Sequence, residues 1–124
     1  MNEFCNYLQL YHLNEIININ QNNITLRPGL KPLRFNTADF EITPKAQHSD
    51  SGTLFEINTE ITADLCNNSE KERYRTPTPC IIILHTSERL IRLGELDLPA
   101  LVSVNSLLQK ERLTLNIKTI SSPL

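Results

Sequence analysis

Residues 55–65 read FEINTEITADL, and apolar and polar residues alternate along this stretch with a period of two. The odd positions hold Phe55, Ile57, Thr59, Ile61, Ala63 and Leu65, and the even positions hold Glu56, Asn58, Glu60, Thr62 and Asp64. Successive side chains of a β-strand point to opposite faces of a sheet, so the pattern predicts a long strand with one buried face and one solvated face. A helix would place Glu60 and Asp64 beside apolar neighbours, and the β-branched residues also favour a strand.

The C-terminal half of the chain continues this β pattern. The apolar run CIIIL at 80–84 predicts a strand that is covered on both faces or lies centrally in a sheet. A short polar connection leads from it to RLIRL at 89–93, which predicts a first hairpin. ALVSV at 100–104 and RLTLNIKTI at 112–120 predict a second hairpin, and the linking residues 105–111 could hold one turn of helix.

The front half is more ambiguous. Residues 7–13 alternate between apolar and polar, but the apolar parity then switches, which suits a strand with a bulge or a bend from one sheet to another. A helix over roughly 3–16 is the competing interpretation, and the sequence leaves both open. The polar segments 44–52 and 67–79 contain turn-forming residues, and we expect both to be exposed loops.

These elements together predict a mainly β fold. We expect an antiparallel β-sandwich or a small β-barrel of about seven strands, with room for one short helix. A chain of 124 residues fits a single β-rich domain over residues 1–124 and can bury a core without disulfides.

The charge balance limits the partners. A net charge of −2 argues against a dedicated nucleic-acid binder, which would usually be basic, and gives no reason to expect an anionic membrane surface as partner. No secretory signal and no membrane-spanning run is recognisable. The cysteines Cys5, Cys66 and Cys80 are odd in number and have no CxxC spacing, so a disulfide framework is not expected and a cytoplasmic location fits. Cys66 and Cys80 are interpreted as small buried hydrophobes.

The spacing of the histidines does not indicate a catalytic or metal-binding site. His12, His48 and His85 lie far apart in the sequence and lack the spacing of a zinc site. We interpret His85 as a hydrogen-bonded residue at a strand end and His48 as a solvated loop residue. We therefore expect no metal ion and no cofactor.

Two further patterns could be taken for catalytic groups. HSDSG at 48–52 contains the residue types of a serine hydrolase triad, but adjacent residues point in different directions, and a turn is the better interpretation. Glu56, Glu60 and Asp64 share one strand face, where carboxylates are most simply solvated groups rather than the acid–base pair of a glycosidase. The sequence thus predicts a protein that is not an enzyme.

One segment has the composition of a contact surface. Arg73, Tyr74 and Arg75 belong to the residue types that are enriched in protein interfaces, and they lie in the charged segment SEKERYR. We predict that these three residues form a partner-binding site.

The segment TPCIIILHTSERLIRLGELDLPALVSV followed by RLTLNIKTISSPL resembles small phage-type structural proteins encoded in prophage regions of gut bacteria. The residues that carry the resemblance are Leu93-Gly94, Pro99 and Ser121-Ser122-Pro123, and GTLFEINTEI matches the start of the long strand. HTSE at 85–88 replaces the glycine-containing turn that is usual there. The resemblance covers roughly residues 52–124 and implies a virion or tail-assembly component without catalytic residues.

Two functions remain after these exclusions. The first is a structural or interaction protein that self-associates as a homo-oligomer, either in the cytoplasm or assembled into a phage particle. The alternative is a small ligand-binding barrel or sandwich whose cavity would be lined by inward residues such as Phe55, Ile57 and Leu115.

Overall fold

A computed structural model describes most of the chain. The described residues are 4–21, 23–41, 45–49, 52–66, 68–86, 90–96 and 98–119. They form ten β-strands and two short 3-10 turns, with no α-helix among them, which confirms the predicted mainly β class. The elements are β1 (Phe4–His12), η1 (Leu13–Glu15), β2 (Ile16–Asn20), β3 (Asn23–Leu26), β4 (Leu33–Glu41), β5 (Lys45–Ser49), β6 (Gly52–Asp64), η2 (Ser69–Tyr74), β7 (Thr78–Thr86), β8 (Leu90–Leu93), β9 (Ala100–Ser106) and β10 (Lys110–Thr119).

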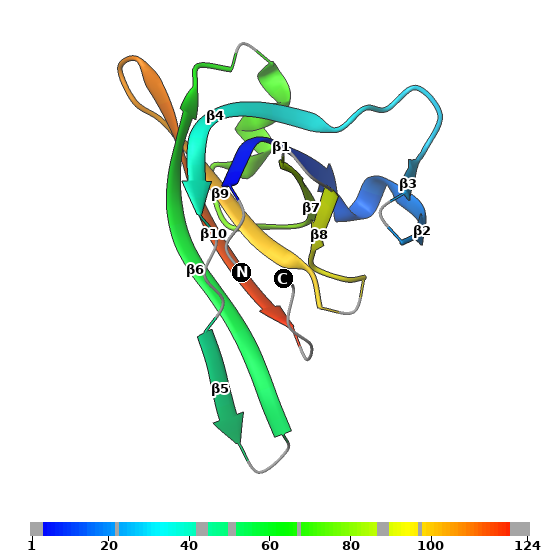
Figure 1. Ribbon diagram of the computed structural model, residues 1–124. Coiled ribbons are helices and arrows are strands. Elements are labelled where there is room, and N and C mark those ends of the chain that lie inside the picture. Colours follow the sequence, from blue (N-terminus) through cyan, green and yellow to red (C-terminus); the bar gives the residue numbers. More distant parts are fainter. Residues whose placement is uncertain are drawn as a thin grey trace.

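The main sheet closes on itself as a barrel. Its strand order is β1-β4-β6-β10-β9-β7, and β7 pairs back onto β1, with every pairing antiparallel (Figure 1). The strand β8 pairs with β7 beyond the point where β9 leaves it, and β5 pairs with one end of β6. A separate hairpin of β2 and β3 makes a second, two-stranded sheet. Of the two architectures that the sequence left open, the pairing is that of a barrel.

The strand β6 runs along the whole length of this barrel and has the predicted alternation (Figure 1). It pairs with β10 without interruption from Asp64 opposite Lys110 to Phe55 opposite Thr119. Its odd residues Ile57, Ile61 and Ala63 are buried in the core. The even residues Asn58, Glu60, Thr62 and Asp64 are exposed, so one face is buried and the other is solvated as the period of two requires.

The barrel interior is filled with aliphatic side chains from every strand of the ring. The buried core cluster consists of Leu8, Leu10, Leu33, Phe35, Ile57, Ile61, Ala63, Tyr74, Cys80, Ile82, Leu84, Ile91, Leu93, Ala100, Val102, Val104, Leu113, Leu115 and Ile117. The strand β7 is also buried on its other face, because Ile81 and Ile83 are 0% and 2% exposed. On that face Arg92, opposite Ile83, donates from Nη1 to the carbonyl oxygen of Gln21 at 2.5 Å, which places the tip of the β2–β3 hairpin there.

Both predicted hairpins are present, but two other expectations were wrong. Residues 45–49, expected in a loop, form the strand β5. Residues 107–110 make a tight turn closed by the hydrogen bond from Leu107 N to Lys110 O, so no helical turn joins β9 to β10. The parity switch after residue 12 coincides with the 3-10 turn η1, where the chain passes from the barrel sheet to the separate β2–β3 sheet, as the predicted bend from one sheet to another requires.

The first strand resolves the ambiguity of the front half. Residues 4–12 form β1, and the competing helix over 3–16 is absent from the described part of this segment. Local alternation was the better guide because Leu8 and Leu10 both enter the core. No helical segment among the described residues is long and apolar enough to cross a membrane.

The strands β4 and β5 both pair with β6 on the edge opposite β10. Thr37 of β4 pairs with Ala63, and Lys45 of β5 pairs with Glu56. Of these two pairings, only that of β4 belongs to the barrel ring.

The turn after β8 depends on a glycine. Gly94 has a φ of 94°, and a Cβ atom at this position would lie 2.9 Å from the backbone nitrogen of Ala100. Two backbone hydrogen bonds between Glu95 and Leu98, of 3.0 and 3.1 Å, then close the connection toward β9. The left-handed backbone and the close approach of Ala100 both require that residue 94 lack a side chain.

The Gly94→Ala substitution should destabilise the fold by about 2–3 kcal/mol, because it adds a steric clash to the cost of a left-handed backbone. Gly29→Ala is the matched control, since Gly29 also has a positive φ, of 83°, but nothing lies within 4 Å of the added Cβ. We expect about 1 kcal/mol for this control. Urea unfolding of both variants measures the difference, and equal losses would show that the close contact at Gly94 contributes nothing.

Candidate functional site

The three residues predicted to bind a partner lie at the end of η2, and the structure separates their roles. Tyr74 is 0% exposed and belongs to the core cluster, so its side chain offers no surface to a partner. Arg73 and Arg75 are exposed, but both are held in ion pairs. Only the two arginines of the predicted contact site therefore remain accessible.

Each arginine makes a bidentate ion pair with a glutamate. The Arg73 guanidinium donates to both carboxylate oxygens of Glu15 at 2.9 and 3.1 Å, and thereby links η2 to η1. This hydrogen bonding lowers the pKa of the Glu15 carboxyl. Arg75 donates to both oxygens of Glu72 at 2.7 and 2.8 Å and to the carbonyl oxygen of Val104 at 3.4 Å. The segment predicted to be an exposed loop is thus fixed to its surroundings at both arginines.

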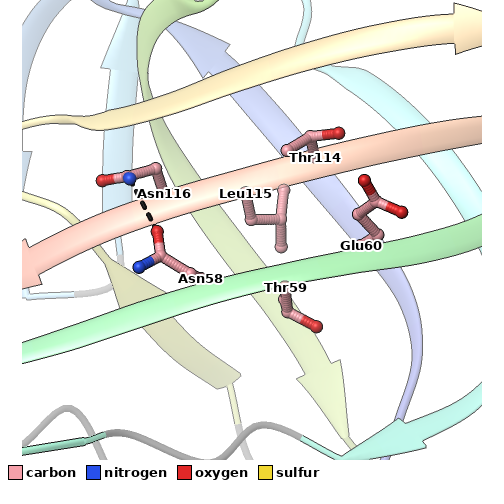
Figure 2. Close-up of a pocket in the computed structure, with 6 residues that line it drawn as sticks. All are labelled: Asn58, Thr59, Glu60, Thr114, Leu115 and Asn116. Atoms are coloured by element: carbon pink, nitrogen blue, oxygen red, sulfur yellow. Dashed lines mark hydrogen bonds between the residues drawn. The ribbon is translucent and has the colours of Figure 1, made fainter.

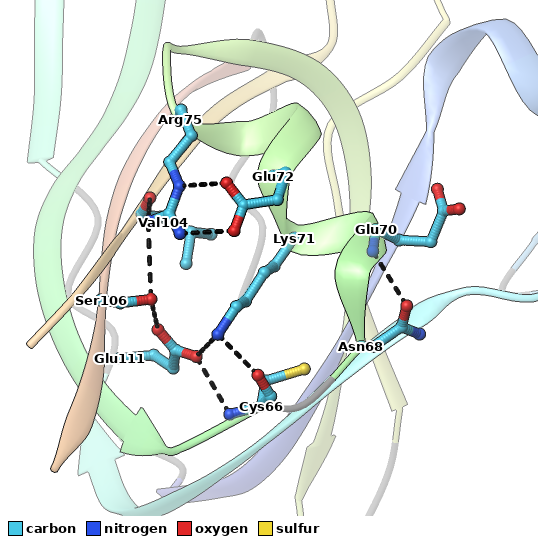
Figure 3. Close-up of polar contacts among 9 residues, drawn as sticks. All are labelled: Cys66, Asn68, Glu70, Lys71, Glu72, Arg75, Val104, Ser106 and Glu111. Atoms are coloured by element: carbon cyan, nitrogen blue, oxygen red, sulfur yellow. Dashed lines mark hydrogen bonds and ion pairs between the residues drawn. The ribbon is translucent and has the colours of Figure 1, made fainter.

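A buried carboxylate holds the other side of η2 (Figure 3). The side chain of Glu111 on β10 is 0% exposed, and its Oε2 accepts hydrogen bonds from Lys71 Nζ at 2.7 Å and from the Cys66 backbone nitrogen at 3.0 Å. Its Oε1 accepts from the hydroxyl of Ser106 at 2.5 Å. Lys71 Nζ also donates to the carbonyl oxygen of Cys66 at 2.7 Å. We call these four residues the Glu111 clamp.

The electrostatics of the clamp favour a charged carboxylate. Burial raises the pKa of Glu111, but the hydrogen bonds from Lys71, Ser106 and the Cys66 backbone outweigh burial, so the pKa is lowered overall. Both carboxylate oxygens are engaged by donors. An acid in this state neither gives nor takes a proton near neutral pH, and the clamp is a structural element that joins β10 to η2.

Tyr74, the last residue of η2, is buried in the barrel core. The ring of Tyr74 meets that of His12 edge-on, with centroids 6.1 Å apart. Its hydroxyl is buried without a hydrogen-bond partner among the described residues. Burial raises the pKa values of both the Tyr74 hydroxyl and the neighbouring Cys80 thiol. The Cys80 thiol is therefore protonated and enclosed, as the interpretation of a small buried hydrophobe requires.

The predicted hydrogen bond at His85 is present on the outer face of β7. His85 Nε2 lies 2.8 Å from Gln9 Oε1, and its ring stacks on Tyr7 with centroids 4.0 Å apart. The Arg34 guanidinium carbon is 3.9 Å from the Tyr7 ring centre. Burial and then the Arg34 charge lower the pKa of His85. The three strands β4, β1 and β7 are thereby joined through their outer side chains, while the side chain of His48 lies outside the described residues.

A hollow of about 310 Å³ opens on the outer face of β6 and β10 (Figure 2). It is lined by three successive cross-strand pairs: Asn58 with Asn116, Thr59 with Leu115, and Glu60 with Thr114. The first and third pairs face outward, since Asn58 and Glu60 are exposed while Leu115 is in the core. Sequence reasoning named Glu60 only as a solvated carboxylate and gave no signal for the hollow, which needs the register of β6 on β10.

Hydrogen bonds order one side of this hollow. Asn116 Nδ2 donates to Asn58 Oδ1 at 2.6 Å, and Asn58 Nδ2 donates to Glu56 Oε1 at 2.6 Å. A carboxylate can only accept, so Glu56 sets the orientation of the Asn58 amide, which in turn sets that of Asn116. Across the hollow, the side chains of Glu60 and Thr114 have no partner among the described residues. No group of three potential metal ligands occurs in the described part of the chain.

Glu111→Gln should lower the free energy of unfolding at neutral pH by about 3 kcal/mol, because it removes the buried charge with which the half-buried Lys71 ammonium is paired. The lowered pKa of Glu111 means that the carboxylate stabilises the fold above its unfolded pKa of about 4.3, and that this contribution is lost as pH falls through the lower folded pKa. Urea unfolding between neutral and acidic pH should therefore show a smaller loss for the variant than for the natural protein.

Two variants control this experiment. Asp64→Asn removes the exposed pair with Lys110, whose Nζ is 3.4 Å away, and should cost less than about 0.5 kcal/mol. Lys71→Met leaves the buried Glu111 carboxylate without its cation, so the stability penalty of this variant should shrink as acid protonates that carboxylate. A Glu111→Gln protein as stable as the natural one at neutral pH would contradict the role of the clamp.

Comparison with known proteins assigns the chain to no family. No family model matches it, and neither the curated proteins nor the solved structures contain a match to it.

Proposed function

We propose that this chain is a non-enzymatic assembly protein that self-associates by pairing the free edge of β5 with the β5 edge of a second copy. The observation that carries the proposal is the projecting arm formed by β5 and residues 52–56 of β6, which extends away from the barrel (Figure 1). Exposed strand edges are sites at which another chain can add a strand.

Only two paired strands, β5 and β6, are described at the tip of the arm. The strand β5 pairs with β6 from Lys45 opposite Glu56 to Ser49 opposite Gly52. On the other side of β6, pairing with β10 is described only as far as Phe55. Beyond that point the described sheet has two strands, and no described residue pairs with the far edge of β5. A two-stranded hairpin is only marginally stable in water, so the arm gains from additional strands.

Symmetry makes a second copy the fitting partner. Two β5 strands related by a two-fold axis perpendicular to the sheet run antiparallel, which is the pairing used throughout the barrel. Each copy then supplies the same backbone donors and acceptors, and the two arms merge into one four-stranded sheet. The sequence of β5, KAQHS, contains no large apolar residue, so backbone pairing rather than side-chain burial drives the contact.

The setting in a virion or tail rests on the sequence resemblance of residues 52–124 to phage-type structural proteins. That segment includes the arm strand β6 and both hairpins of the barrel. The alternative function, a ligand cavity inside the barrel, has less support. Two of its expected lining residues, Ile57 and Leu115, are 2% and 0% exposed within the packed core, and the side chain of Phe55 lies outside the described residues.

Proline substitutions in β5 test the proposal. In an antiparallel ladder the backbone N–H groups of neighbouring residues point to opposite edges, so Ala46 and Gln47 differ in which edge they serve. Of the variants Ala46→Pro and Gln47→Pro, one removes a donor from the free edge and the other removes a donor to β6. Light scattering coupled to gel filtration should give a dimer or larger oligomer for the natural protein, and a monomer for the free-edge variant with little change in melting temperature.

The control is Leu108→Ser, at the β9–β10 turn, where Leu108 is 95% exposed. Loss of this side chain should leave the oligomer intact, because the proposed contact lies on the β5 arm. A natural protein that stays monomeric at the highest attainable concentration would refute the proposal. Oligomers that survive both prolines, or that dissociate on Leu108→Ser, would refute strand pairing at β5.

A further inference from the structure

We infer that the hollow on the outer face of β6 and β10 is a binding site for a neutral polyhydroxylated ligand, a saccharide. Its walls are the hydrogen-bonded Asn58–Asn116 pair on one side and Glu60 with Thr114 on the other (Figure 2). The site is separate from the β5 edge and does not depend on self-association.

The hydrogen-bonding groups around the hollow match those of sugar hydroxyls. A sugar hydroxyl both donates and accepts hydrogen bonds. The walls supply matching groups, because the two asparagine amides and the Thr114 hydroxyl can donate and accept, and the Glu60 carboxylate can accept. The relay from Asn116 through Asn58 to Glu56 fixes both amides before a ligand arrives. A fixed wall lowers the entropy that binding would otherwise cost.

The neighbouring strand extends this polar surface. In the register of β10 with β9, Ser103 lies beside Thr114, and Leu101 lies beside Asn116. Adjacent strands are about 4.8 Å apart, so the row of Glu60, Thr114 and Ser103 presents three polar groups at regular steps. The side chain of Leu101 is 41% exposed and gives one apolar contact next to the amide pair. The surface is long enough for more than one sugar ring.

The charges favour a neutral ligand over an ion. Glu60 would repel an anion, and the next outward pair along the strands places exposed Arg112 opposite Thr62, on the same face as Glu60. Glu56 and Glu60 are four residues apart on one strand, a separation of about 13 Å, so they cannot chelate one cation together. The lining contains no aromatic ring, and hydrogen bonds must supply most of the affinity. A dissociation constant on the order of 1 mM is therefore expected.

Titration followed by ¹⁵N-resolved NMR tests the inference, because asparagine side-chain amides give their own signals. The probes are cellohexaose, chitohexaose and maltohexaose, each raised to about 20 mM, well above the expected dissociation constant. At least one of them should shift the side-chain amides of Asn58 and Asn116 and the backbone amides of Glu60 and Thr114. The same titration with trilysine separates a cationic ligand from a neutral one.

Substitutions of similar shape then locate the binding. Thr114→Val and Glu60→Gln should each weaken saccharide binding by about fivefold, the effect of losing one hydrogen bond. Thr62→Val is the matched control, because Thr62 is exposed on the same face but does not line the hollow. The inference is overturned if no hexasaccharide shifts these amides, if trilysine alone does, or if Thr62→Val weakens binding as much as Thr114→Val. Shifts that follow protein concentration instead would assign the face to self-association.

Discussion

The ladder between β6 and β10 is the constraint on which the rest of the molecule depends. These two strands pair from Asp64–Lys110 to Phe55–Thr119, and each also borders another part of the ring. The inward residues of the ladder build one wall of the core, and its outward residues line the hollow. The continuation of β6 past the barrel carries β5. A slip of one residue would turn the core side chains outward and bury the carboxylates, so this single register fixes the core, the hollow and the arm together.

The Glu111 clamp makes this ladder compatible with a closed barrel end. The inward side chains of β10 are those at odd positions, and Glu111 is one of them. Its carboxylate therefore points to the core side of the sheet, where an apolar side chain would be expected. Hydrogen bonds from Lys71, Ser106 and the backbone of Cys66 meet it there and bring η2 across the barrel end. Tyr74 then enters the core at that end. The hydrogen bonds from these donors offset the free-energy cost of burying the Glu111 charge, and they hold η2 in place over this end of the barrel.

Local patterns in the sequence predicted the features that are set within one strand or between two strands joined by a short connection. The alternation of residues 55–65, the doubly buried run at 80–84 and the two hairpins all follow from side-chain direction and short connections, and each is present. The predicted contact site failed at Tyr74 because this side chain is buried in the core with its ring against His12 of the first strand, a contact that the local sequence does not indicate. The strand β5 was missed because its sequence, KAQHS, has no alternation of large apolar and polar residues, and its pairing with β6 is a backbone feature that the sequence does not show. The hollow likewise exists only once Asn116 lies opposite Asn58.

The proposed pairing of two copies through β5 would place two of the proposed saccharide sites on the same face of one sheet. A two-fold axis perpendicular to a sheet reverses strand direction but keeps each face on the same side, so joining two copies through β5 would leave both hollows facing the same way. A shallow site that relies on hydrogen bonds binds weakly on its own. Two such sites on one joined sheet could bind one polysaccharide chain together, and linked binding of this kind raises overall affinity by about 10²–10⁴-fold without any new contact. Self-association through the arm would then determine how strongly the outer face of β6 and β10 holds a repeating ligand.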